Sequence, residues 1–280
     1  MEVGRVQRVR QAEVSLQIGS LCSGYAGLDL AVESVLESET AWFVEYDAAP
    51  SKILSHNRPG VPNHGDVMTT DWSELPPIDI LTAGYPCQPF SLAGLRRGPE
   101  DERNIWPYVH DAVRVLRPRI VVLENVTGHL SLGFGRVLGD LAGIGYDSEW
   151  RCLRASDVGA PHSRARLFIV ASDSNHARLE GHRKLHAPTG EGEAPAHAGG
   201  PWQEFGPAIR RWEKVMGRSA PPIMGADGNH NPALVEWMMG LPEGWVTDVP
   251  GLSRKDKIKA LGNGVVPQQA AAAIERMVPA

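Results

Sequence analysis

Short apolar runs that alternate with longer helical or polar stretches are the feature that most constrains the fold of this chain. Leu16–Leu21, Ile78–Ala83 and Ile120–Val126 have the length and apolar content of buried strands. Residues 104–116 and 134–144 carry helical patterns between such runs. This alternation predicts an α/β fold in which a doubly wound sheet lies between helices.

A single cysteine follows one of these predicted strands, between two prolines, in Pro86-Cys87-Gln88-Pro89. The prolines fix φ and cannot continue a helix or a ladder, so they predict a stiff loop. Ligands of open α/β sheets bind at the carboxyl ends of the strands, which makes Cys87 a candidate nucleophile. The alternative is a small buried apolar residue, since free cysteine is often buried.

Two further strands carry charged groups at their ends. Glu124 stands near the end of the run 120–126, and Arg164 and Arg166 lead into the apolar run 167–170. Spacing of two residues puts both guanidinium groups on one face of a strand. Each feature has an ordinary structural explanation when it is taken alone, a surface carboxylate in one case and a solvated strand edge in the other.

Taken together and in this order, the segments resemble the DNA (cytosine-5) methyltransferase family. The matching segments are residues 84–91 around the cysteine, Glu124-Asn125-Val126, the paired arginines, and 261–267 near the end of the chain. The resemblance implies a Rossmann-like S-adenosylmethionine-dependent methyltransferase domain with a small target recognition domain. It also implies sequence-specific DNA modification of the compact bacterial or phage type, as in restriction-modification systems.

The motifs predict three parts of the chain. Residues 1–171 form the catalytic and cofactor-binding domain, 172–230 the target recognition domain, and 231–280 a return segment that completes the first domain. Residues 172–206 are rich in Gly, His, Pro and Ala without a steady period, and regular structure is expected to fade there. In the return segment, 231–242 reads as a capped helix ended by Gly and Pro, and 267–277 as an Ala-rich helix.

The cofactor residues come partly from physical reasoning and partly from the resemblance. A glycine-bearing turn that enters a helix after the first strand suits the polar tail of S-adenosylmethionine, and an acid after the second strand suits the ribose, which points to Glu45. The resemblance places Tyr46 on the adenine ring, Asp66 at its amino group and Asn263 by the amino-acid end, with S-adenosylhomocysteine as the product. The complete set is Cys22, Ser23, Gly24, Tyr25, Gly27, Leu28, Glu45, Tyr46, Asp66, Val67, Pro86 and Asn263.

Three positions depart from the pattern of the family. Cys22 replaces a Phe, and Ala26 replaces one of a pair of glycines, so an ordinary φ is expected at Ala26. His162 replaces a Gln, and we expect it to make a pH-sensitive contact to substrate or loop.

The resemblance assigns a catalytic role to four residues. The Cys87 thiolate adds to carbon 6 of cytosine, and a neutral Glu124 with a raised pKa hydrogen-bonds or protonates ring nitrogen 3. Arg166 and Arg164 hold the carbonyl oxygen at carbon 2 and favour the thiolate. Because a base inside a duplex cannot be attacked in this way, the target nucleotide must be flipped out.

DNA contacts are expected in two places. The glycine-punctuated stretch 91–103 resembles the mobile catalytic loop of the family, and the region after residue 172 supplies further basic groups. The predicted contacts are Ser91, Arg96, Arg97, Arg103, Arg178, Arg183, Lys184, Arg210 and Arg211. The net charge of the chain is −5, whereas residues 151–219 hold 11 Lys or Arg against 7 Asp or Glu, which assigns the phosphate-facing surface to this half.

The composition of the chain indicates its cellular compartment. Three cysteines without metal-ligand spacing favour a reducing compartment and predict no metal site and no disulfide framework. No signal peptide or membrane span is visible, so a cytoplasmic protein that meets no membrane is predicted, and a monomer because one chain has every expected part.

Two other functions stay open at this point. A tRNA cytosine-5 methyltransferase shares the cysteine and acid motifs. An inactive DNA-binding homologue is conceivable because Cys22, Ala26 and His162 depart from the pattern.

Overall fold

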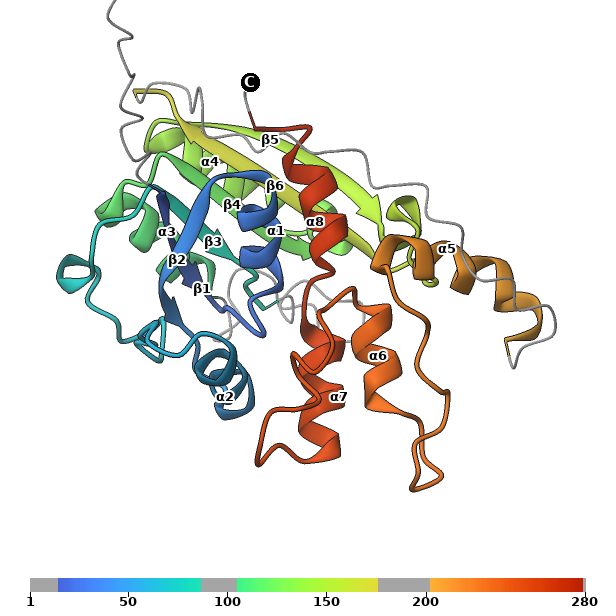
Figure 1. Ribbon diagram of the computed structural model, residues 1–280. Helices are drawn as coiled ribbons and strands as arrows, with labels where there is room; N and C mark the ends of the chain where they lie inside the picture. The colour runs from blue at the N-terminus through green and yellow to red at the C-terminus, as the bar shows by residue number, and fades with distance from the viewer. Residues whose placement is uncertain (1–14, 87–104, 176–201, 279–280) are drawn as a thin grey trace, which may run out of the picture.

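A six-stranded mixed sheet forms the centre of the computed structural model, which describes residues 15–86, 105–175 and 202–278 (Figure 1). Its spatial order is β2-β1-β3-β4-β6-β5. The four strands β1 to β4 are parallel, and β6 runs antiparallel to both β4 and β5. The bounds are β1 Leu16–Leu21, β2 Ser38–Val44, β3 Ile80–Ala83, β4 Ile120–Val126, β5 Tyr146–Arg154 and β6 Ala165–Asp173.

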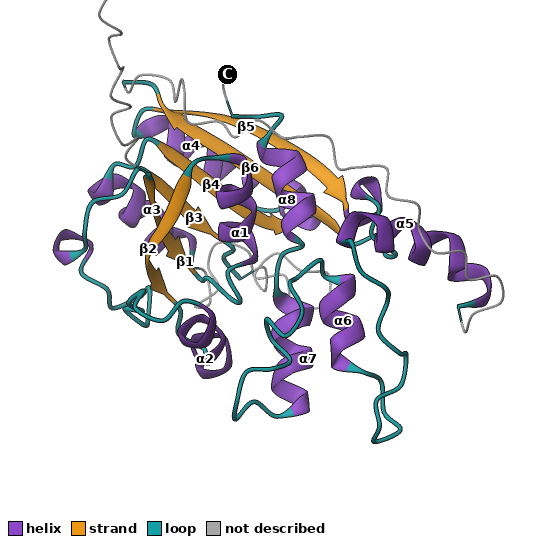
Figure 2. Ribbon diagram, in the orientation of Figure 1, coloured by secondary structure: helices purple, strands orange, loops and turns teal. Residues whose placement is uncertain are grey.

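Helices cover both faces of the sheet (Figure 2). Helices α1 and α8 pack on one face and α3 and α4 on the other, whereas α2, α6 and α7 gather at one end of the sheet. The bounds are α1 Gly27–Val35, α2 Ala48–Asn57, α3 Trp106–Leu116, α4 Phe134–Gly143, α5 Gly206–Met216, α6 Pro232–Met238, α7 Arg254–Asn263 and α8 Pro267–Ile274.

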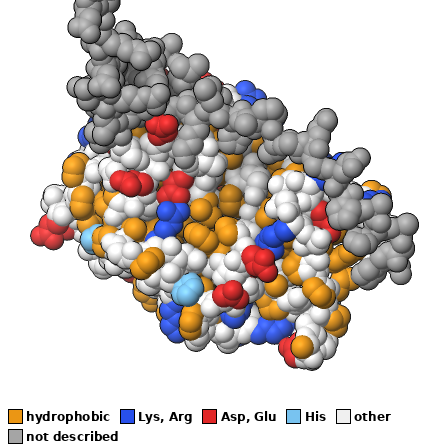
Figure 3. All heavy atoms as spheres, in the orientation of Figure 1, with side chains coloured by type: hydrophobic (Ala, Val, Ile, Leu, Met, Phe, Trp, Pro, Cys, Tyr) orange, Lys and Arg blue, Asp and Glu red, His pale blue; other side chains and the backbone are white. Residues whose placement is uncertain are grey.

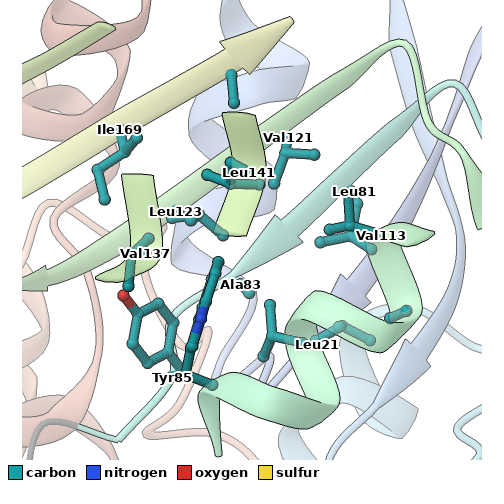
Figure 4. Packing of buried hydrophobic residues seen from close by; sticks show 14 of the residues in the cluster. Leu21, Leu81, Ala83, Tyr85, Val113, Val121, Leu123, Val137, Leu141 and Ile169 are labelled. Carbon is teal, nitrogen blue, oxygen red and sulfur yellow. The ribbon is translucent and has the colours of Figure 1, made fainter. Parts of the chain in front are cut away.

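The central strands bury both faces, which explains why their sequences are apolar throughout. On β4, Val121 and Leu123 point into the cluster under α3 and α4, while Ile120 and Val122 point into the cluster under α1 and α8. Figure 4 shows the first cluster, in which Tyr85 lies among the aliphatic side chains. A run that is apolar on both faces therefore marks a strand between two helical layers.

The predicted doubly wound α/β class is confirmed, and β1 and β4 have the predicted bounds. The sequence reasoning did not find β5, the edge strand that pairs with β6. Residues 149–152 of this strand are exposed, so the strand has no apolar run to reveal it.

Residues Gly206–Met216 form helix α5, which the sequence reasoning did not predict. Helix α5 buries Ile209 and Trp212 and leaves the opposite side exposed. Only three of its eleven residues are buried, which explains why the pattern is hard to see. The predicted capped helix is α6, whose cap Asn231 accepts a hydrogen bond from the Ala233 amide at 3.0 Å.

The end of the chain packs against its beginning. The Tyr25 hydroxyl donates to the Val265 carbonyl at 2.7 Å, and the Trp245 indole donates to the Tyr25 carbonyl at 2.8 Å. Gly264 is required at this contact, because a Cβ there would overlap the Tyr25 ring. Tyr25 therefore joins the turn before α1 to the return segment.

The parts of the chain that the structure describes lack two features. None of the helices there has the length and apolar character needed to span a membrane. Those same residues also contain no cluster of His, Cys, Asp and Glu side chains suited to a metal ion.

Candidate active site

One edge of the sheet collects the polar groups that the sequence singled out. The parallel strands β1 to β4 end there and the antiparallel β6 begins there. Because β1 connects outward to β2 while β3 lies on its other side, this edge contains a topological switch point, where open α/β sheets bind ligands. A pocket lies at that point. It is lined by Ser20, Leu21, Cys22, Ser23, Gly24, Tyr25, Gly27, Leu28, Asp29, Thr82, Gly84, Glu124, Asn263, Gly264 and Val265.

The turn between β1 and α1 has left-handed backbone at Cys22 (φ 49°), Gly24 (φ 57°) and Ala26 (φ 67°). The prediction of an ordinary φ at Ala26 is therefore wrong. The turn keeps its shape because the Ala26 amide donates to the Ser23 carbonyl at 2.8 Å, and because the buried Ala26 methyl packs with Phe43 and Leu54. The tertiary structure imposes a conformation that alanine alone disfavours.

Glu45 joins the ends of β1 and β2. Its carboxylate accepts from the Gly24 amide and from the Asp47 amide, each at 2.8 Å. Burial raises the pKa of this carboxyl group, and the amide donors oppose the rise. Each carboxylate oxygen retains a further acceptor site, so the expected bond to a ribose hydroxyl fits the geometry.

The predicted adenine contacts lie beside this acid but outside the lining of the pocket. The Tyr46 side chain is 79% exposed, and Val67 is buried. Asp66 accepts from the Met68 amide at 2.9 Å. Burial raises the pKa of the Cys22 thiol to about 12, and the nearby negative charges of Glu45 and Asp66 contribute to the rise. The segments that follow β1, β2 and α2 therefore lie close together at this point.

Glu124 and Arg166 form a largely buried ion pair. Glu124 lies opposite Phe168 in the β4–β6 ladder, so Arg166 is its diagonal neighbour on the same face. The Arg166 Nε atom stands 2.9 Å from the Glu124 Oε1 atom. Burial raises the pKa of Glu124, and the positive charges of Arg166 and Arg164 oppose that rise.

The second arginine has a different contact. Arg164 donates from Nη2 to the Gly264 carbonyl at 2.7 Å and so ties the start of β6 to the return segment. Gln269 on α8 links β5 to the residue before β6, since its amide donates to the carbonyls of Leu153 at 2.8 Å and Arg164 at 2.9 Å. The two arginines therefore lie together, as predicted, but have different partners.

A hydrogen-bonded network fixes the backbone that leads toward Cys87. Asn125 donates to the Tyr85 carbonyl at 3.3 Å, and the Tyr85 hydroxyl lies 2.9 Å from His129 Nε2. His129 Nδ1 lies 2.8 Å from the Leu132 carbonyl, which only accepts, so Nδ1 carries the proton and Nε2 accepts from Tyr85. Burial lowers the pKa of His129 and keeps it neutral.

The Nε2 atom of His162 contacts the return segment and not the pocket. Its Nε2 atom lies 3.0 Å from the Met238 carbonyl at the end of α6. Burial lowers its pKa, and the neighbouring Arg164 and Arg166 lower it further. A neutral His162 that donates to Met238 links the arginine segment to the return segment, and the predicted contact to substrate or loop stays a prediction.

Sequence reasoning did not assign a role to Asp29, although it lines the pocket. This side chain is 1% exposed and accepts hydrogen bonds from Ser20 Oγ at 2.9 Å and Thr82 Oγ1 at 2.5 Å. Burial raises its pKa to about 6. The available signal was an acid in the first turn of a helix that otherwise turns apolar residues toward the core.

Of the predicted DNA contacts, the described residues contain Arg210 and Arg211, both exposed on α5. The face seen in Figure 3 carries acidic and basic side chains intermixed, in agreement with the small net charge. The remaining predicted contacts and the candidate nucleophile lie outside the described residues. They are Cys87, Ser91, Arg96, Arg97, Arg103, Arg178, Arg183 and Lys184.

Comparisons with known proteins agree with the motifs. A family model described as C-5 cytosine-specific DNA methylase matches residues 16–197. The chain is 32% identical to the type II methyltransferase M.NaeI of Lentzea aerocolonigenes over 237 residues, which cover 78% of this chain and 54% of that protein. It is 27% identical to M.NgoMIV of Neisseria gonorrhoeae over 257 residues, which cover 85% and 78%.

The fold has counterparts among solved structures. The S. pombe Dnmt2 methyltransferase superposes with a TM-score of 0.63 at 16% identity, over 92% of this chain and 97% of that one. The chain spans about half the length of several of the curated relatives it matches, among them M.NaeI.

Proposed function

Because this chain belongs to the C-5 cytosine-specific DNA methylase family, we propose that it transfers a methyl group to carbon 5 of a flipped-out cytosine in duplex DNA. The observation that carries the proposal is the largely buried Glu124–Arg166 pair, of which Glu124 lines the pocket that begins at the glycine-bearing turn. A carboxyl group with a raised pKa beside a cation is suited to a ring nitrogen and a ring carbonyl.

In this proposal Cys87 is the nucleophile. Its thiolate adds to carbon 6 of the cytosine, and Glu124 in its acid form donates a hydrogen bond to nitrogen 3 as negative charge develops in the ring. Arg166 holds the carbonyl oxygen at carbon 2, and Arg164 keeps the return segment in place. After methyl transfer a base, either a water molecule or a side chain, takes the carbon 5 proton, and the Cys87 thiolate is eliminated from carbon 6.

The chain's own residues fit S-adenosylmethionine, which would supply the methyl group. The left-handed turn at Gly24 brings backbone close to the pocket, and Asn263 lies in its lining. Glu45 has acceptor capacity for ribose hydroxyls, and the exposed Tyr46 ring offers a flat apolar face for a purine. Asp66 and Val67 complete the proposed adenine side.

The proposed partner is double-stranded DNA, and the proposed setting is the cytoplasm of a bacterial or phage-infected cell, where the protein acts as a monomer. The exposed Arg210 and Arg211 on α5 support a phosphate contact by this helix. Residues 172–230 are proposed to select the target sequence.

Covalent trapping tests the proposal. The protein is incubated with S-adenosylmethionine and duplex DNA that contains 5-fluorocytosine, and a complex that survives denaturation is expected. Cys87→Ser is the control and should trap nothing. Trapping on fluorinated tRNA but not on DNA would shift the substrate to RNA, and no trapping on either by a protein that binds the cofactor would indicate an inactive homologue.

The target sequence follows from expression in cells that lack cytosine methylation. Bisulfite sequencing of their DNA is expected to show one methylated motif that depends on Cys87. DNA that stays unmethylated, despite folded protein in the cell, would contradict the proposal.

A further inference from the structure

One carboxylate in the wall of the pocket has no role in the proposed chemistry. Asp29 stands in the first turn of α1 and reaches between β1 and β3, where Ser20 and Thr82 donate hydroxyl hydrogen bonds to its two oxygens. The network continues, since Ser23 Oγ lies 2.8 Å from Ser20 Oγ, whose one hydrogen is donated to Asp29. Asp29 therefore sits beneath the glycine-bearing turn.

A buried carboxylate normally has a cation beside it, because an isolated charge is costly to remove from water. Among the described residues, none forms an ion pair with Asp29. The positive charge of Arg58 slightly lowers the pKa of Asp29. Arg58 forms its ion pair with Glu33, however, which lies one turn after Asp29 on α1. Two hydroxyl groups compensate the charge only in part, and the pKa of about 6 leaves it ionised at neutral pH.

The position of Asp29 indicates which ligand group would meet this charge. The pocket it lines includes Asn263 and the start of α1 but not Glu45 or Tyr46, so it is the half of the site assigned to the cofactor's amino-acid end. That end carries an α-ammonium and an α-carboxylate. The helix N-terminal amides suit the carboxylate, which leaves the ammonium to a negative group.

We propose that Asp29 supplies the negative charge that balances the α-ammonium group of the cofactor, acting across the pocket wall together with the hydroxyls of Ser20 and Thr82. This inference rests on the proposed function, because it requires that the pocket bind S-adenosylmethionine. It makes Asp29 a positioning residue that selects the amino-acid end of the ligand. In the low effective dielectric of a protein wall, a charge at short range contributes more to binding than it does in water.

Calorimetric titration of the whole chain tests this without any catalytic step. The ligands are S-adenosylhomocysteine and its analogue in which hydrogen replaces the α-amino group. For Asp29→Asn we expect affinity for S-adenosylhomocysteine to fall roughly tenfold, equivalent to about 1.4 kcal/mol, and affinity for the deaminated analogue to stay within about twofold. Glu33→Gln is the matched control, because it removes one negative charge from α1 one turn away and outside the pocket lining.

The outcomes separate this inference from the proposed function. Equal losses for both ligands, or no loss for either, would overturn the role of Asp29 while leaving the cofactor assignment intact. Wild-type protein that binds neither ligand would overturn the cofactor assignment and the inference with it. If Asp29→Asn does not fold, Asp29→Ser removes the same charge with a smaller side chain that still makes hydroxyl hydrogen bonds, and it is held to the same expectation.

Discussion

Two buried carboxylates lie at the same edge of the sheet, and they differ in what surrounds them. Glu124, 8% exposed, has the guanidinium of Arg166 at 2.9 Å, supplied by the neighbouring strand. Within residues 15–86, 105–175 and 202–278, the side-chain partners of Asp29, which is 1% exposed, are the hydroxyls of Ser20 and Thr82. The protein compensates one charge itself and leaves the other under-compensated, which is expected where a ligand brings the missing cation.

The pKa is raised at both carboxyl groups, but the consequence differs. At Glu124 burial outweighs the arginines, and the acid form is the one the proposed chemistry needs. At Asp29 the rise to about 6 stops short of neutral pH, so the charged form persists there. The same physical cause, desolvation, thus supports proton donation at one site and charge balance at the other.

The largest effect is expected for Glu124→Gln. An amide cannot act as the acid toward nitrogen 3, so the methyl-transfer rate should fall roughly 100- to 10,000-fold. The rate of the wild type should also decline as pH rises through the raised pKa of Glu124, because the charged form cannot donate. Radiolabelled methyl transfer to DNA measures both, and the affinity for S-adenosylhomocysteine, measured alongside, separates a loss of cofactor binding from a loss of the acid. A variant with near wild-type rate would remove Glu124 from the mechanism.

Arg166→Met tests the compensated site directly. Removing the cation strands a buried carboxylate, and we expect the free energy of unfolding to fall by about 3–5 kcal/mol, measured in urea. The double variant Arg166→Met with Glu124→Gln should recover most of this loss, since no charge is then left without its partner. Equal instability of the single and double variants would show that packing of the Arg166 stem, and not the charge, accounts for the loss.

Asp29→Asn tests the under-compensated site through stability. Because the folded pKa of about 6 lies above the ordinary value of 3.8, the folded state binds this proton more tightly than the unfolded chain does. The resulting stabilisation is complete below pH 3.8 and is lost as pH rises through 6, by up to about 3 kcal/mol.

The ligand-free Asp29→Asn variant should therefore be more stable than the wild type at pH 8 and should lose that advantage toward pH 4. Urea unfolding at several pH values measures it. A constant difference between the variants at all pH values would mean that Asp29 does not titrate in this range.

Ala26→Gly should have the smallest effect and separates backbone strain from charge in the turn before Asp29. Left-handed backbone costs alanine about 1–2 kcal/mol, whereas the buried methyl contributes about 0.8 kcal/mol. We expect a gain below about 1 kcal/mol with no pH dependence, in contrast to Asp29→Asn. A loss of stability would show that the packing of the methyl against Phe43 and Leu54 outweighs the strain.

The sequence by itself determined the α/β class, the strands β1 and β4, the capped helix α6 and the gathering of Glu124, Arg164 and Arg166 at one edge. These features depend on local patterns, namely continuous apolar runs, an Asn cap before Pro, and spacing of two along a strand. The motifs of the family include several of the same residues, among them Glu124, Arg164 and Arg166.

The tertiary structure alone decided the rest. Strand β5 is an exposed edge without an apolar run, and Ala26 adopts a left-handed φ because the surrounding turn and the Phe43 contact hold it there. The different partners of Arg166 and Arg164, and the burial of Asp29 between β1 and β3, depend on which strands become neighbours. Contacts between residues more than 50 positions apart leave no periodic trace in the sequence, because they arise only when the sheet brings those segments together.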